Sequence, residues 1–251
     1  MNRAPKRFWD FPSALLILLA LLVACQRLSA TGWTSNLGIV SILALCGALL
    51  GLPLGWSRFG RGTLLWFSLV YTLVFVPFIL AWLLYPGVPW LERMTAMGGR
   101  LAYSFGVLAA GQPLEDAFAF LAAFSLGFWL IGLYSAHALT RSASFSASAL
   151  PAGAALVMIQ IFDNQGDQGV AFVAVYLFLA LFLLGRLNYA RRRVSWQAWR
   201  LFSSGEARAN INFTVLAGAF LLVAAAWVFP VSPRSIPLLR EWWQEDRKSV
   251  V

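Results

Sequence analysis

The sequence is poor in charged and catalytic side chains. Only 12% of its 251 residues are charged, and it has one histidine and two cysteines, whereas soluble domains carry about 25% charged residues. Cys25 and Cys46 lie inside apolar stretches without a CxxC spacing, so they are typical of small buried residues. His137 has no His, Cys or acidic neighbour in sequence that would complete a metal site. We expect no metal, no cofactor and no catalytic residue in this chain.

Several motifs that carry chemistry are also missing. The sequence has no HExxH, no GxSxG and no phosphate-binding loop. No Asp or Glu falls in the middle of a long apolar stretch, where ion-coupled transporters usually place ionisable groups. These absences count against an intramembrane enzyme. The net charge of +9 does not indicate a nucleic-acid partner, because the basic residues occupy short connections rather than one polar face.

Apolar sequence makes up most of the chain. Hydrophobic residues account for 60% of it, and the mean hydropathy is +0.73, which is typical of an all-α polytopic membrane protein. A helix needs about 17–25 residues to cross the hydrocarbon core. Seven stretches meet this length: residues 11–28, 37–56, 63–85, 117–139, 145–162, 170–190 and 211–229. They predict a transmembrane helix bundle over residues 1–230, with membrane lipids as partners.

The arginine-rich stretch at residues 185–208 predicts the orientation of the bundle. It includes the consecutive Arg191, Arg192 and Arg193, and such clusters stay on the cytoplasmic side of a bilayer. The predicted cytoplasmic segments hold 12 basic and 2 acidic residues, a net charge of 12 − 2 = +10. The predicted outer segments hold 7 and 8, a net charge of 7 − 8 = −1. This asymmetry predicts seven spans with the N-terminus inside and the C-terminus outside.

Residues 86–116 are predicted to form an extracytoplasmic loop. Part of this loop is apolar enough to suggest a further span, but a crossing there would place the arginine cluster outside. We therefore expect an interfacial helix over about residues 90–110, with its charged side chains facing water. The two acids just before the next span suit the N-terminus of a helix. The charged residues of the loop, which form a candidate functional surface, are Glu92, Arg93, Arg100, Glu115 and Asp116.

Some residues inside the predicted spans have structural interpretations. Gly47, Gly51 and Gly55 stand four residues apart, a spacing that lets a neighbouring helix approach closely. We expect that neighbour to belong to the same chain, with homodimerisation as the alternative. Arg27, at the outer end of the first span, is expected to extend its charge to the membrane interface.

Short motifs occur in a recognisable order between residues 111 and 230. They are GQPLED at residues 111–116, an aromatic stretch with Trp129, then Arg141, ALPAG at residues 149–153, the basic connection with Trp196, and VFP at residues 228–230. In this order they resemble the N-terminal membrane region of TgpA-type transglutaminase-like proteins of bacteria. The resemblance covers about half of the chain, because the first three spans share only their hydrophobicity with that region.

The resemblance implies a bundle in the bacterial plasma (inner) membrane that anchors a large extracytoplasmic domain. That domain would carry a papain-like Cys-His-Asp triad and act on a protein or peptide substrate. Only 21 residues follow Pro230, too few for such a domain, so no catalytic residue carries over to this chain. We interpret residues 231–251 as an extracytoplasmic linker. Residues 246–251 can be encoded as GATCGGAAGAGCGTCGTG, which reads as a common sequencing adapter, so we expect a truncated reading frame whose natural sequence ends near Glu245.

The leading functional interpretation is a non-catalytic membrane anchor. It would belong to a transglutaminase-like or peptidase-like cell-envelope protein and would position an extracytoplasmic domain that is missing from this chain. The alternative is a stand-alone small-solute transporter or lipid-handling protein that uses residues 86–116. Whether the parent protein is an enzyme depends on the missing domain.

Overall fold

The computed structural model describes residues 8–111, 117–163, 166–198, 213–214, 216–221 and 223–224. In this part of the chain the backbone is helical apart from turns and short connections, and it contains no strand, so the predicted all-α fold is confirmed. The chain divides into two compact units, residues 1–202 and 203–251. The described residues of the second unit are helical.

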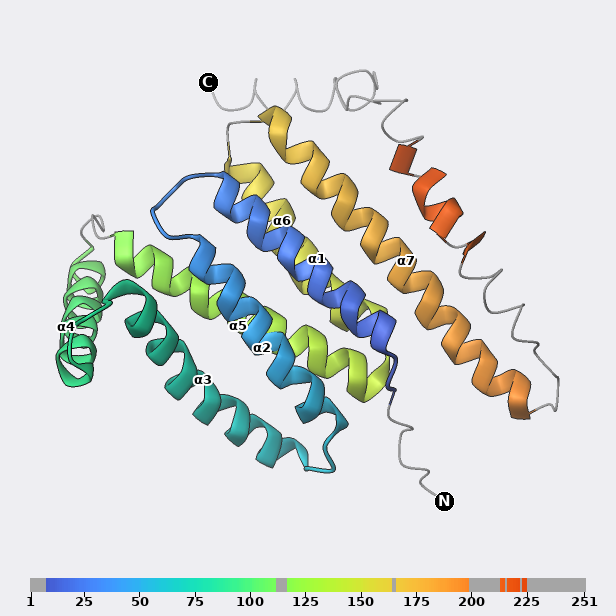
Figure 1. The fold of residues 1–251 in the computed structure, drawn as a ribbon, viewed down its shortest axis with the longest axis horizontal. Helices are drawn as coiled ribbons and strands as arrows, with labels where there is room; N and C mark the ends of the chain where they lie inside the picture. The colour runs from blue at the N-terminus through green and yellow to red at the C-terminus, as the bar shows by residue number, and fades with distance from the viewer. Residues whose placement is uncertain are drawn as a thin grey trace, which may run out of the picture. The chain divides into compact units, whose positions relative to one another are not determined.

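The first unit contains a series of long helices (Figure 1). They are α1 (Phe11–Ala30), α2 (Gly38–Trp56), α3 (Arg61–Leu84), α4 (Trp90–Ala109), α5 (Ala117–Ser142), α6 (Phe145–Phe162) and α7 (Gly166–Ala198). Among the described residues, six helices are long and apolar enough to cross a membrane, and α4 is not one of them. Length and composition therefore indicate a membrane protein. The predicted seventh span, residues 211–229, lies largely outside the described residues.

Helix α7 is longer than the span predicted from the sequence. It begins four residues earlier, at Gly166, and continues to Ala198. At about 1.5 Å per residue, its 33 residues reach about 50 Å, which exceeds a hydrocarbon core of about 30 Å. Residues 191–193 therefore continue the helix instead of starting a loop. The rest of the arginine-rich stretch, residues 199–208, lies outside the described residues.

Successive membrane-length helices run in opposite directions (Figure 1), and two contacts between helix ends agree with this order. At one end of the bundle, the backbone N–H of Phe8, just before α1, donates to the carbonyl of Thr140 near the end of α5 at 3.0 Å. At the other end, Arg27 near the end of α1 pairs with Asp163 after α6. We call these the Asp10 end and the Asp163 end of the bundle.

Helices α2 and α5 pack closely because glycines face the partner's backbone. A Cβ added to Gly47 or Gly51 would come within 3.0 Å of the carbonyl oxygen of Trp129 or Leu133. The contact is reciprocal, because a Cβ on Gly132 would meet the carbonyl of Ala44 in the same way. The prediction that the α2 glycines pack against a helix of the same chain is confirmed.

Helix α3 packs on the bundle along one side only. The buried indole of Trp129 donates from Nε1 to Thr72 Oγ1 at 2.9 Å and so joins α5 to α3. Leu65, Trp66 and Val74 on α3 are exposed. In a bilayer these side chains would face lipid, where apolar exposure costs little.

Candidate functional site

The predicted interfacial helix is present as α4, and it carries three of the five predicted surface residues. It begins and ends within one residue of the predicted bounds. Figure 1 shows α4 beside the point where α3 ends and α5 begins, at the Asp163 end. Glu92 is exposed in its first turn, as expected. Glu115 and Asp116 lie outside the described residues.

Arg93 is half-buried and holds α4 against α3. Its guanidinium lies over the ring of Trp82 with 5.6 Å between Cζ and the ring centroid. Its Nε donates to the carbonyl of Val88 at 2.5 Å. A cation over an aromatic face is attracted by about 0.5–2 kcal/mol. Arg93 was expected to face water, but its side chain packs on Trp82 near the end of α3.

Arg100 is exposed and lies next to the beginning of α5. Its Cζ is 4.8 Å from the centroid of the Phe118 ring, and its Nη1 donates to the hydroxyl of Tyr85 at 3.1 Å. These contacts hold a positive charge at the Asp163 end of the bundle, between helices α3, α4 and α5.

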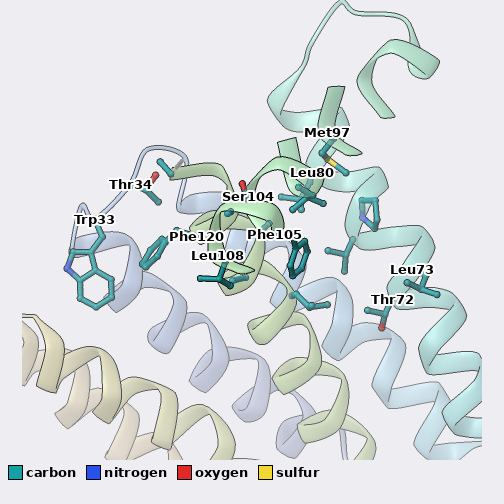
Figure 2. Close-up of a pocket in the computed structure, with 18 residues that line it drawn as sticks. Trp33, Thr34, Thr72, Leu73, Leu80, Met97, Ser104, Phe105, Leu108 and Phe120 are labelled. Atoms are coloured by element: carbon teal, nitrogen blue, oxygen red, sulfur yellow. The ribbon is translucent and has the colours of Figure 1, made fainter. Parts of the chain in front are cut away.

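A cavity of about 970 Å³ lies between α3, α4, α5 and the loop from α1 to α2. Ligand pockets usually measure about 300–1,000 Å³, so this cavity is at the large end of that range. Figure 2 shows Trp33 and Phe120 on one side, Thr72 and Leu73 on the other, and Phe105 of α4 between them. The sequence indicated the charged residues of this segment but not the apolar cavity that α4 helps to line.

The walls of the cavity are almost entirely apolar. The polar side chains in its lining are Thr34, Thr72 and Ser104. Thr72 Oγ1 donates to the carbonyl of Ser68 at 2.7 Å and accepts from Trp129. Ser104 is buried, and its hydroxyl donates to the carbonyl of Arg100 at 2.9 Å. Two of the three hydroxyls are thus engaged with the protein, so the cavity suits a hydrocarbon group better than a polar solute.

A second cluster is a buried ion pair at the Asp163 end. Arg27 Nη2 lies 2.5 Å from Asp163 Oδ2, and Arg27 Nε donates to Gln160 Oε1 at 3.1 Å. Arg27 is 2% exposed and Asp163 is 8% exposed. The expectation that Arg27 reaches the interface is wrong, because the carboxylate of Asp163, just after α6, compensates its charge inside the protein. The sequence could have suggested this ion pair, because both residues fall near the ends of predicted spans on the same predicted side of the membrane.

A third cluster joins α1 to α7 at the Asp10 end. Arg186 binds Asp10 through two hydrogen bonds, from Nε at 2.6 Å and Nη2 at 2.9 Å. Asp10 also caps α1 by accepting from the backbone N–H of Ser13 at 3.2 Å. Burial raises the pKa of Asp10, but the hydrogen bonds and charge of Arg186 outweigh it and hold the pKa below its ordinary value of 3.8.

None of these clusters resembles a metal centre. Within the described residues, no group of three or more His, Cys, Asp or Glu side chains is placed to hold a metal ion. The side chains of Arg191, Arg192 and Arg193 lie outside the described part of the structure. No protein-family model, curated protein or solved structure matches this chain.

Proposed function

We propose that the chain is the membrane anchor region of a cell-envelope protein, and that its bundle positions an extracytoplasmic domain absent from this sequence. The observation that carries the proposal is that ion pairs join helices at both ends of the bundle. Arg27 and Asp163 join α1 to α6, and Asp10 and Arg186 join α1 to α7. Ion pairs at both ends suit a scaffold whose helices keep one arrangement.

The residues that carry the TgpA-type resemblance support this proposal where they are described. Trp129 is completely buried. Arg141 Nη1 donates to the carbonyl of Ser57 at 3.1 Å and so joins the end of α5 to the end of α2. The carbonyl of Ala149 accepts a hydrogen bond from the hydroxyl of Tyr176 on α7. Each residue makes a contact between helices, as expected if the resemblance comes from a shared membrane bundle.

The distribution of charge supports an orientation with the Asp10 end in the cytoplasm. Arg58, Arg61, Arg141 and Arg186 lie at this end, together with Asp10. Basic residues near the ends of spans remain on the cytoplasmic side. The Asp163 end, with α4 and the cavity, is then extracytoplasmic, on the side where the proposed domain would act.

An independent long read across the locus tests the anchor proposal. We expect a reading frame that continues beyond residue 245 into a domain with Cys, His and Asp in the order of a transglutaminase-like triad. A genuine stop codon after Val251 would contradict it. A reporter fused after Trp243 tests the orientation separately, because a phosphatase there would be active only outside the cytoplasm.

A lipid-handling protein is the second candidate, and the cavity is the observation that favours it. The cavity lies beside the predicted interfacial helix and has apolar walls, whereas small-solute transport would need polar groups to bind the solute. Deleting the downstream domain separates the two candidates. A lipid-related phenotype that survives the deletion favours lipid handling, and a phenotype that is lost with the domain favours the anchor.

A further inference from the structure

We propose that the cavity between α3, α4 and α5 holds an acyl chain of a membrane phospholipid, with its phosphate near Arg100. The inference requires only that the bundle lies in a bilayer. It therefore applies whether the chain is an anchor or a lipid-handling protein.

The walls of the cavity select a hydrocarbon ligand. Val76 and Leu80 of α3, Leu101 of α4, and Phe120 and Leu126 of α5 line it. A polar ligand would lose its hydrogen bonds to water in this space, at a cost of about 1–3 kcal/mol for each unpaired group. An acyl chain has no such groups to satisfy.

The dimensions of the cavity match one leaflet of a bilayer. Its lining runs along α3 from Thr72 to Leu80, about 12 Å at a rise of about 1.5 Å per residue. Along α5 it runs from Ala117 to Leu126, about 14 Å by the same rise. One leaflet contributes about half of a hydrocarbon core of about 30 Å. An acyl chain entering from the Asp163 end would therefore reach from the interface to near the bilayer centre.

The cavity is open to the surroundings of the protein. Leu73 on α3 is 65% exposed, and Phe105 and Leu108 on α4 are 68% and 62% exposed, although all three line the cavity. In a membrane the opening between α3 and α4 faces lipid. A chain can enter from the side without crossing the bundle.

Two arginines at the rim offer donors to a lipid phosphate, and the acidic Glu92 lies next to one of them on α4. Arg100 directly precedes Leu101, which lines the cavity. Its guanidinium lies over the ring of Phe118, whose neighbours in sequence, Ala117 and Ala119, also line the cavity. Arg93 adds a second positive charge about two helical turns away on α4. Arginine binds phosphate oxygens strongly, through charge-assisted hydrogen bonds.

Photo-crosslinking in nanodiscs tests this site. The full chain is reconstituted with phosphatidylglycerol that carries a diazirine in one acyl chain, and labelled residues are identified by mass spectrometry. We expect labels on cavity residues such as Leu101 and Ala123 in preference to the exposed Leu65 of α3. The Ala123→Phe variant fills the cavity and should lower its labelling about tenfold, the change that a loss of about 1.4 kcal/mol in binding produces.

Matched variants show whether the effect is specific. Ala171→Phe adds the same side chain at an exposed position of α7 outside the cavity and should leave the labelling unchanged. If Ala123→Phe does not fold by size-exclusion chromatography, the milder Ala122→Leu replaces it, because Ala122 also lines the cavity. Equal labelling of Leu65 and the cavity residues would overturn the proposal.

The phosphate contact is tested with the same diazirine lipid. Arg100→Gln should reduce the labelling of the cavity residues. Arg58→Gln, at the Asp10 end, serves as the control and should not change it. Equal labelling of the Arg100→Gln variant and the unmodified chain would overturn the placement of the phosphate.

Discussion

At the scale of single residues, the ion pairs decide how α1 is held. A buried ion pair loses hydration on both partners, and its attraction compensates for that loss only while both charges are present. Arg27 and Asp163 are in this position because both are almost completely buried. Their arrangement makes the stability of the bundle sensitive to removal of either partner alone.

We predict that Arg27→Met destabilises the protein by about 3–5 kcal/mol, the usual cost of leaving a buried charge without its partner. The double variant Arg27→Met, Asp163→Asn should lose less than the sum of the two single variants, because it leaves no unpaired charge. Equilibrium unfolding in detergent micelles measures all three. Additive losses would show that the pair is not coupled.

The ion pair between Asp10 and Arg186 should make the stability of the protein depend on pH. Its pKa lies below 3.8 in the folded protein, so the pair with Arg186 contributes its full stability above the unfolded pKa. That contribution falls as pH drops through the folded pKa. The thermal midpoint should therefore decline below about pH 4, and Asp10→Asn should reduce the decline because it has no charge to lose.

A second substitution separates the two roles of Asp10. Asn is a good N-cap residue, whereas replacing an N-cap with Ala costs about 0.5–2 kcal/mol. Asp10→Ala should thus be less stable than Asp10→Asn at neutral pH, in addition to losing the pair with Arg186. Equal midpoints for the two variants would show that capping of α1 contributes nothing.

At the scale of helices, the close contact of α2 with α5 depends on residues that lack a side chain. Gly47 and Gly51 allow the backbone of α5 to approach, and Gly132 does the same in return. The spacing of the α2 glycines predicted a helix contact, but not which helix would form it. That choice depends on the surface of α5, where Gly132 and buried Trp129 complete the contact.

We predict that Gly47→Ala destabilises the protein by about 1–3 kcal/mol, since the added methyl group would meet the carbonyl of Trp129 and force the helices apart. Gly127→Ala is the control, because no atom lies within 4 Å of its added Cβ. It should be neutral or stabilising by up to about 1 kcal/mol through helix propensity. Thermal unfolding compares the two, and equal losses would rule out a contact effect.

At the scale of the whole molecule, the placement of α4 determines the topology. If α4 crossed the membrane, α5 and the helices after it would change sides relative to the first three. The structure places α4 at the Asp163 end, between the end of α3 and the beginning of α5. Its charges pack on aromatic residues at the ends of these helices, an arrangement typical of a membrane interface.

Cysteine labelling in right-side-out membrane vesicles tests this topology. In a Cys25→Ala, Cys46→Ala background, a membrane-impermeant maleimide should label Ser35→Cys and Thr95→Cys directly. It should label Gly60→Cys only after permeabilisation, because that residue lies at the predicted cytoplasmic end. These three positions are exposed. Direct labelling of Ser146→Cys, exposed in the first turn of α6, would contradict the interfacial assignment of α4, because a crossing by α4 would place that residue outside.

Much of the fold could be predicted from the sequence because hydrophobicity along a chain is a local property. Stretches of about 20 apolar residues must form helices in a membrane, where unpaired backbone groups are too costly. The same reasoning placed α4, because its mixture of charges and apolar residues differs from that of a span. It failed for α7, where an apolar helix continues without interruption into charged residues.

The sequence by itself determined the class of the protein, the positions of its apolar helices and the residues that favour one orientation. The tertiary structure alone decided the partners of Arg27 and Asp10, the helix that α2 contacts and the cavity between α3, α4 and α5. The reason is physical: composition sets where a segment is stable, whereas an ion pair or a cavity depends on residues far apart in the chain. Arg27 and Asp163, 136 residues apart, meet only in the folded bundle.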